Sequence, residues 1–246
     1  MNRGHFPGAL LTTRRIFMRP WRLKMEIPYL AGGILCTLFL SWAGTTIIAP
    51  WCGLLNGAII STFAGAFLLL ALAYMTFPRG FISWKTGFRR VGWREIKLIA
   101  VVLIVLLAGS AALTGVWQQI LDHLQIPYEE EQVLVQMAKN CSYKTFGQLL
   151  LLTAVAVPLT EELVFRRFLY ELLQGLGAKT ALFAGAFIFA AAHGFLLGMP
   201  GLFFMGILFQ ILCNSTRNLW CSVICHSLLN ASVLIMTRAV FLLVKD

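Results

Sequence analysis

The stretch Thr145–Leu173, TFGQLLLLTAVAVPLTEELVFRRFLYELL, decides the fold, because it is long and apolar enough to cross a bilayer yet carries two adjacent carboxylates, Glu161 and Glu162. A charge at that depth must be neutralised, paired or hydrated, so ionisable groups inside a membrane are candidates for a functional site. Glu162 and Arg166 stand four residues apart and can pair on one helix face. Glu161 points about 100° away and has no local partner. Glu161 is therefore the carboxylate available for chemistry.

The composition of the whole chain is that of a membrane protein. Of its 246 residues, 59% are hydrophobic and 12% are charged, and the mean hydropathy of +0.80 is well above that of soluble globular proteins. No linker-like segment and no internal repeat divides the sequence. We therefore expect an all-α, polytopic transmembrane helical bundle over residues 27–246, preceded by a basic cytoplasmic segment at 1–26.

The net charge of +10 would suit a nucleic-acid partner, but the basic residues flank the apolar runs, where they fix orientation and contact anionic lipid. We expect the lipid bilayer as partner and no nucleic acid. Met1–Glu26 and Pro78–Lys97 each hold six basic residues and one acidic residue, whereas Trp117–Lys144 holds four acidic and two basic residues. This asymmetry predicts a multi-pass protein with a cytoplasmic N-terminus, which we expect in a prokaryotic inner membrane.

The apolar runs predict seven or eight spans. The predicted crossings are 27–49, 54–77, 96–116, 145–173, 180–197, 202–213 and 219–238. Whether Ala239–Val244 continues the last helix or forms an eighth element stays open, as does the oligomeric state. Six cysteines show neither CxxC nor metal-ligand spacing, although Cys52 and Cys141 could both lie outside and pair. Pro158 should kink the fourth crossing and free a backbone carbonyl.

Polar side chains on three predicted crossings lie at compatible depths. His193 is on the fifth crossing and His226 on the seventh, with Asn230 four residues later on the same helix face. Counted at about 1.5 Å per residue from the predicted cytoplasmic ends, Glu161 lies about 18 Å deep, His193 about 20 Å and His226 about 10 Å. Each group alone could merely tie helices together. Together, they predict one functional site.

Three motifs in this order are similar to those of a known family. Glu161–Arg166 (EELVFR) matches EExxxR, Phe189–His193 (FAAAH) matches FxxxH, and His226–Asn230 (HSLLN) matches HxxxN. Over about residues 146–232, the chain resembles the CAAX-prenyl-protease and bacteriocin-processing family of intramembrane glutamic proteases (CPBP, or Abi). Arg167 departs from the pattern, since a small residue is expected after the motif arginine.

The resemblance implies an intramembrane endopeptidase that hydrolyses a peptide bond of a membrane-associated or lipidated substrate without a cofactor. Glu161 and His193 are implied as the pair that activates water, and His226 and Asn230 as the groups that line the oxyanion site. The chemistry agrees with these roles, because peptide hydrolysis needs a general base and donors aimed at the developing oxyanion. The substrate itself cannot be read from the sequence.

Three further residues are expected to support the site. The resemblance implies that Arg166, paired with Glu162, holds the fourth crossing in place. Phe189 lies one turn before His193 and is expected to pack against it and set the orientation of its ring.

Other classes of protein remain open. Two histidines and a glutamate form a recognised catalytic zinc set, although the sequence has no HExxH motif. A transporter could use the same groups as a proton relay, but transporters usually carry internal repeats. In a non-catalytic scaffold or immunity protein, the polar residues would only join helices.

Overall fold

The computed structural model describes residues 88–130 and 133–245, together with scattered positions between 47 and 67 that include α2 (Ala49–Cys52). Every regular element in these parts is a helix, so the predicted all-α class is confirmed. The first two predicted crossings lie largely outside the described residues. The later elements are α5 (Trp93–His123), α6 (Val133–Asn140), α7 (Tyr143–Leu151), η2 (Leu152–Ala156), α8 (Val157–Glu162), η3 (Leu163–Leu169), α9 (Tyr170–Leu173), η4 (Gln174–Leu176), α10 (Ala178–Ala192), α11 (Met199–Thr216) and α12 (Leu219–Lys245).

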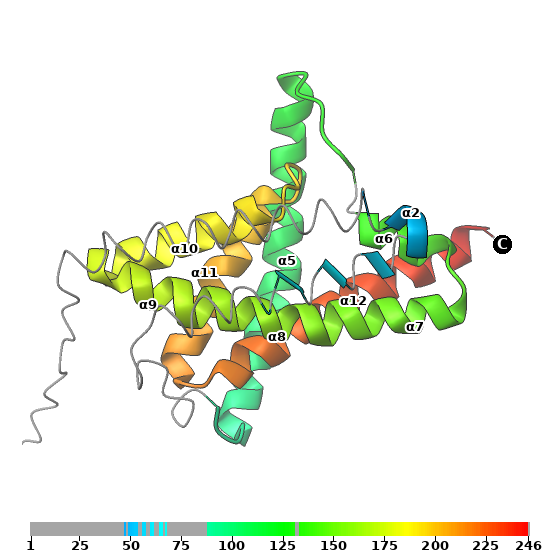
Figure 1. Ribbon diagram of the computed structural model, residues 1–246. Helices are drawn as coiled ribbons and strands as arrows, with labels where there is room; N and C mark the ends of the chain where they lie inside the picture. Colours follow the sequence, from blue (N-terminus) through cyan, green and yellow to red (C-terminus); the bar gives the residue numbers. More distant parts are fainter. Residues whose placement is uncertain are drawn as a thin grey trace, which may run out of the picture.

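One long helix runs through the bundle (Figure 1). It continues from Tyr143 to Leu176 through α7, η2, α8, η3, α9 and η4, so the helix predicted at Thr145–Leu173 is confirmed. Its winding loosens twice to π-helix, in η2 and η3, on either side of the short segment α8. Such π turns are frequent at functional sites, and the two adjacent glutamates lie between them.

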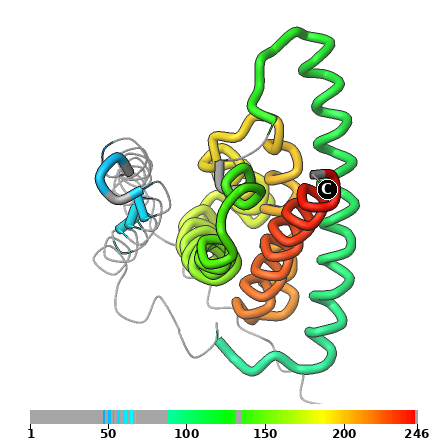
Figure 2. The backbone as a smooth tube through the Cα atoms, turned by 90° about the vertical axis from the view of Figure 1, so that its right-hand side faces the viewer, coloured from blue at the N-terminus to red at the C-terminus, as the bar shows by residue number. Residues whose placement is uncertain are grey.

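The other helices pack around this long helix. In Figure 2, α12 lies between the long helix and α5, and α11 packs along both α10 and α5. A Cβ on Gly206 of α11 would lie 2.8 Å from the Cα of Ala186 in α10. These two backbones therefore approach closely, as small residues allow in membrane bundles.

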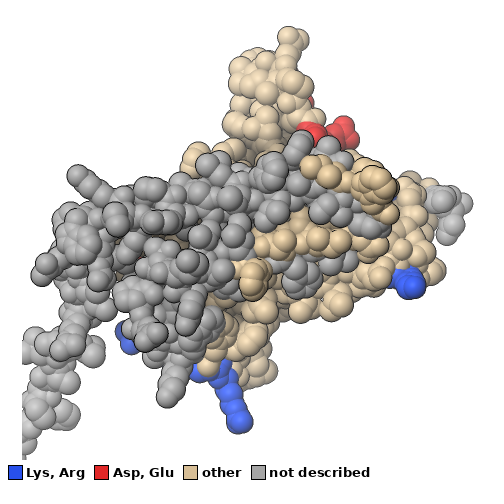
Figure 3. Space-filling model, viewed as in Figure 1, with Lys and Arg blue, Asp and Glu red and all other residues tan. Residues whose placement is uncertain are grey.

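Four of the described helices are long and apolar enough to cross a membrane: α5, the long helix, α11 and α12. α10 is apolar but has only 15 residues. The count of seven or eight spans is thus not confirmed and stays a prediction. On the face seen in Figure 3, acidic side chains lie beside the segment that follows α5, and basic side chains lie near the N-terminal end of α5 and near α7. The orientation of the chain in the membrane stays a prediction.

The ends of two crossings differ from the prediction. The fifth was expected to reach Leu197, but α10 ends at Ala192, and Gly194 takes a φ of +60° that glycine tolerates. The sixth begins earlier than predicted, because Pro200 fits the first turn of a helix, where no N–H partner is needed.

The last predicted crossing continues past Arg238. α12 runs unbroken to Lys245, so Ala239–Val244 belong to it and form no separate element. Cys141 is a free thiol and takes no part in a disulfide. Its sulfur lies 3.4 Å from a guanidinium nitrogen of Arg238.

Candidate active site

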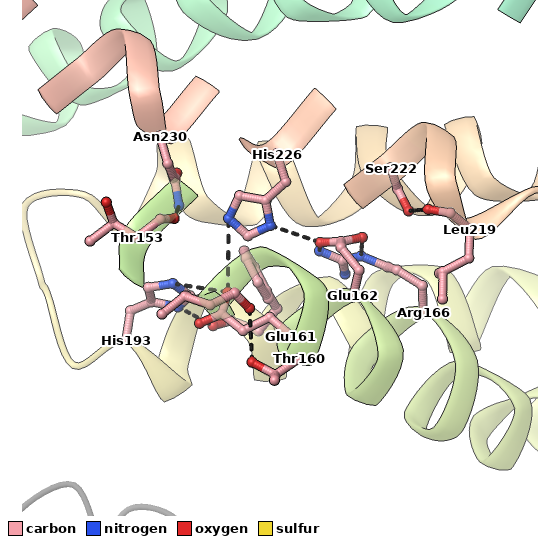
Figure 4. Close-up of polar contacts among 12 residues, drawn as sticks. Thr153, Thr160, Glu161, Glu162, Arg166, His193, Leu219, Ser222, His226 and Asn230 are labelled. Carbon is pink, nitrogen blue, oxygen red and sulfur yellow. Dashed lines mark hydrogen bonds and ion pairs between the residues drawn. The ribbon is translucent and has the colours of Figure 1, made fainter. Parts of the chain in front are cut away.

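A buried carboxylate stands at the centre of the site. Glu162 at the end of α8 is fully buried, and the Nε of Arg166 lies 2.9 Å from one of its oxygens. A second guanidinium nitrogen and the Nδ1 of His226 lie 3.3 Å and 3.0 Å from the other oxygen (Figure 4). The predicted pair of Glu162 and Arg166 is therefore present, and its charges are compensated inside the bundle, as burial requires.

Glu161 has different surroundings, although it is the adjacent residue. Its Oε2 atom is buried and makes no hydrogen bond within the described structure. The Nε2 atoms of His193 and His226 lie 4.0 Å and 3.9 Å from that oxygen. Both distances exceed the length of a direct hydrogen bond. The structure thus brings these three predicted side chains together from α8, the C-terminal end of α10, and α12.

Hydrogen bonds at the opposite ring nitrogens fix how the two imidazoles face Glu161. The Nδ1 of His193 lies 2.8 Å from the carbonyl oxygen of Phe189, which can only accept, so Nδ1 carries the hydrogen. The Nδ1 of His226 donates to the carboxylate of Glu162 in the same way. In both rings, Nε2 is therefore the nitrogen left for chemistry, an orientation set by partners behind the reacting groups.

Two phenylalanines pack against these rings. Phe189, which sequence analysis singled out, contacts His193 edge-on with ring centroids 4.7 Å apart. Phe209 of α11 stacks on His226 with centroids 4.9 Å apart and an interplanar angle of 26°. The guanidinium of Arg166 also lies 4.5 Å from the Phe189 ring centroid. Both phenylalanines are fully buried, so they restrict the imidazoles to one orientation.

Sequence analysis missed Phe209. It lies outside the three motifs, on a crossing whose other residues are also mostly apolar. The chain holds 19 phenylalanines, and composition alone does not distinguish the one that stacks on a site residue. Only the packing of α11 against α12 in the structure identifies Phe209 as a residue of the site.

The amide of Asn230 is held beside the other three groups rather than bonded to them. Its Nδ2 lies 2.9 Å from the carbonyl oxygen of Thr153 in η2. An amide nitrogen has two hydrogens, so one remains available for a ligand. Thr153 is the second contributor that sequence analysis missed, because it acts through a backbone atom that no side-chain motif reports.

The departure at Arg167 does not disturb the site. Arg167 forms an ion pair of 2.7 Å with Glu171, one turn further along the helix. Both side chains are partly exposed, so the arginine lies away from the buried carboxylate. Among residues 88–130 and 133–245 and the scattered positions before them, no group of three or more His, Cys, Asp or Glu side chains is arranged to hold a metal ion.

Fold and site together define a class: a helical membrane protein in which a carboxylate and two imidazoles converge inside the bundle. Comparison with protein-family models matches residues 144–232 to the family described as type II CAAX prenyl endopeptidase Rce1-like. This part of the chain is thus similar to the CAAX protease family, and the match confirms the resemblance drawn from the three motifs. A search of curated proteins gives no significant match, and neither does a search of solved structures.

Proposed function

We propose that this protein is an intramembrane endopeptidase that hydrolyses a peptide bond of a membrane-associated or lipidated substrate with water activated by Glu161. The family supports a protease of the CAAX type. One observation carries the mechanism: the unbonded, buried Oε2 of Glu161 faces the Nε2 atoms of His193 and His226 at 4.0 Å and 3.9 Å.

The first step uses Glu161 as the general base. A water molecule placed about 2.8 Å from the carboxylate and from the Nε2 of His193 forms a hydrogen bond with each. Glu161 takes one proton from this water, and the oxygen attacks the carbonyl carbon of the substrate. A new carbon–oxygen bond forms, and the carbonyl electron pair moves onto the substrate oxygen.

Stabilisation of that oxyanion falls to His226 and Asn230. His226 donates from Nε2 in its doubly protonated form, while its Nδ1 stays bonded to Glu162. Asn230 donates the hydrogen that Thr153 does not use. Loss of one such donor typically lowers kcat by about 10²–10³-fold.

Collapse of the tetrahedral intermediate completes the reaction. The carbon–nitrogen bond breaks, and the proton held by Glu161 passes to the leaving amine. The carboxylate is thereby regenerated for the next cycle. Charge is conserved, since Arg166 pairs with Glu162 throughout and the negative charge that Glu161 loses on taking the proton moves to the oxyanion, where His226 donates.

A comparison of membrane peptides tests the function and does not require a chosen substrate. Cells that make the wild-type protein should contain cleaved peptides that are missing in cells with Glu161→Gln, in which uncut precursors accumulate. Glu171→Gln is the matched control, because it removes a carboxylate from the same helix but outside the site. Identical peptide profiles for wild type and Glu161→Gln would contradict a protease and favour a scaffold or transporter.

Metal dependence is tested with the purified protein and a prenylated peptide that ends in a CAAX motif. We expect cleavage to persist in excess chelator, because the proposed mechanism stabilises the oxyanion with His226 and Asn230 rather than with a metal ion. Complete loss of cleavage that added zinc restores would replace this mechanism with a zinc-dependent one, with His193, His226 and Glu161 as ligands.

A further inference from the structure

The backbone of η2 leaves one carbonyl without its helical partner. The N–H of Val157 donates to Leu152, five residues back, rather than to Thr153. In this register, the next residue would donate to the carbonyl of Thr153, but that residue is Pro158, which has no N–H. The carbonyl oxygen of Thr153 therefore accepts a hydrogen bond from neither Val157 nor Pro158.

The free carbonyl is where Asn230 attaches. Thr153 is buried, and its own hydroxyl is turned back to the carbonyl of Leu149 at 2.8 Å. The Nδ2 of Asn230, arriving from α12, lies 2.9 Å from the Thr153 oxygen. Because a buried carbonyl without a partner is unfavourable, this contact sets which end of the Asn230 amide is the nitrogen. The amide oxygen cannot replace it, since two oxygens would then face each other.

We propose that Pro158 is a positioning residue of the active site. By lacking an N–H, it reserves the Thr153 carbonyl for Asn230 and so directs the second amide hydrogen to the substrate. The inference rests on the proposed function, because it needs Asn230 to act on the oxyanion. Pro158 would thus orient the Asn230 amide in addition to the helix kink expected of a proline.

Substitution of Pro158 tests this assignment, because any other residue restores a backbone donor next to Thr153. In Pro158→Ala, the new N–H competes with Asn230 for the carbonyl. We expect kcat to fall by at least about tenfold and by no more than the 10²–10³-fold typical of losing an oxyanion donor, with KM unchanged. The thermal midpoint should stay level or rise, since alanine favours a helix interior over proline.

A double-mutant comparison separates positioning from a structural role. Pro158→Ala combined with Asn230→Ala should be no slower than Asn230→Ala alone, because the proline acts through the asparagine. Pro200→Ala is the matched control, since Pro200 occupies the first turn of α11. That variant should retain wild-type kcat. Pro158 is fully buried, so Pro158→Val, which keeps more of the side-chain volume, replaces Pro158→Ala if the latter does not fold.

Different outcomes overturn different parts of the account. Wild-type kcat in Pro158→Ala, with Asn230→Ala impaired, would overturn the positioning role alone. So would losses that multiply in the double variant. Wild-type kcat in Asn230→Ala would remove the asparagine from the proposed mechanism, and the inference would fall with it. A structure of Pro158→Ala that keeps the Asn230 to Thr153 contact would also overturn it.

Discussion

Among the residues that the structure describes, two arginines are buried, and they are accommodated in different ways. Arg166 is 3% exposed and pairs with the carboxylate of Glu162. Arg238 is 8% exposed and donates to neutral acceptors, the carbonyl oxygens of Ala138 and Cys141, at 2.8 Å and 3.0 Å.

Two aromatic rings also lie beside Arg238. Its guanidinium lies 5.0 Å and 4.7 Å from the ring centroids of Tyr143 and Phe146. Arg238 thus ties α12 to the corner between α6 and α7, where a cation meets the carbonyl end of a helix. Arg166 instead keeps a second carboxylate ionised beside His226. Arg166 therefore supports the proposed chemistry, whereas Arg238 holds helices together.

The largest effects are expected at the two imidazoles of the site, of which His226 is oriented by the charged pair and His193 by the carbonyl oxygen of Phe189. His193→Ala and His226→Ala should each abolish turnover, or lower kcat by at least about 10²-fold, since each removes a group that contacts water or the oxyanion. The measurement is kcat on a prenylated peptide, with folding checked by gel filtration and thermal unfolding. His123→Ala, an exposed histidine at the end of α5, serves as control and should keep full activity. Near wild-type turnover by either site variant would remove that histidine from the mechanism.

Loss of Arg166 should chiefly affect stability. Arg166→Ala leaves Glu162 buried with an uncompensated charge, which typically costs about 3–5 kcal/mol. We expect a lower folded yield and a lower thermal midpoint in detergent. Arg167→Ala removes the partly exposed neighbouring pair and should cost about 1 kcal/mol or less. Equal midpoints for the two variants would contradict the assigned role of the buried pair.

The smallest effect is expected at the second buried arginine. Arg238→Ala removes hydrogen bonds to neutral carbonyls, so we expect a loss of about 1–3 kcal/mol in unfolding free energy. Because Arg238 lies apart from the site, kcat per folded molecule should stay within about twofold of wild type. Thermal unfolding and active-fraction measurements on the same sample check both values. A large fall in kcat at unchanged stability would show that the contrast between the two arginines is wrong.

The same contrast explains what could be predicted from the sequence. Glu162 and Arg166 are four residues apart on one helix, so local periodicity alone predicts their contact. The partners of Arg238 lie about a hundred residues away, at Ala138 and Cys141, and involve backbone atoms. No local pattern encodes that contact.

Within the candidate site, the sequence predicts which residues take part but not how they contact one another. Motif spacing led to Glu161, His193 and His226, but not to the way His226 faces one glutamate with each ring nitrogen. That bridge depends on the packing angle of α12 against α8. The early end of α10 was likewise missed, because an apolar run does not reveal where Gly194 turns the chain.

The central claim is that the Glu161 carboxylate activates the attacking water, and the kcat of purified Glu161→Gln tests it most directly. Glutamine keeps the shape of the side chain but cannot accept the proton. The account predicts a fall in kcat on the order of 10²–10⁴-fold, with a thermal midpoint like that of wild type. A variant that folds normally and retains kcat within about tenfold of wild type would contradict it.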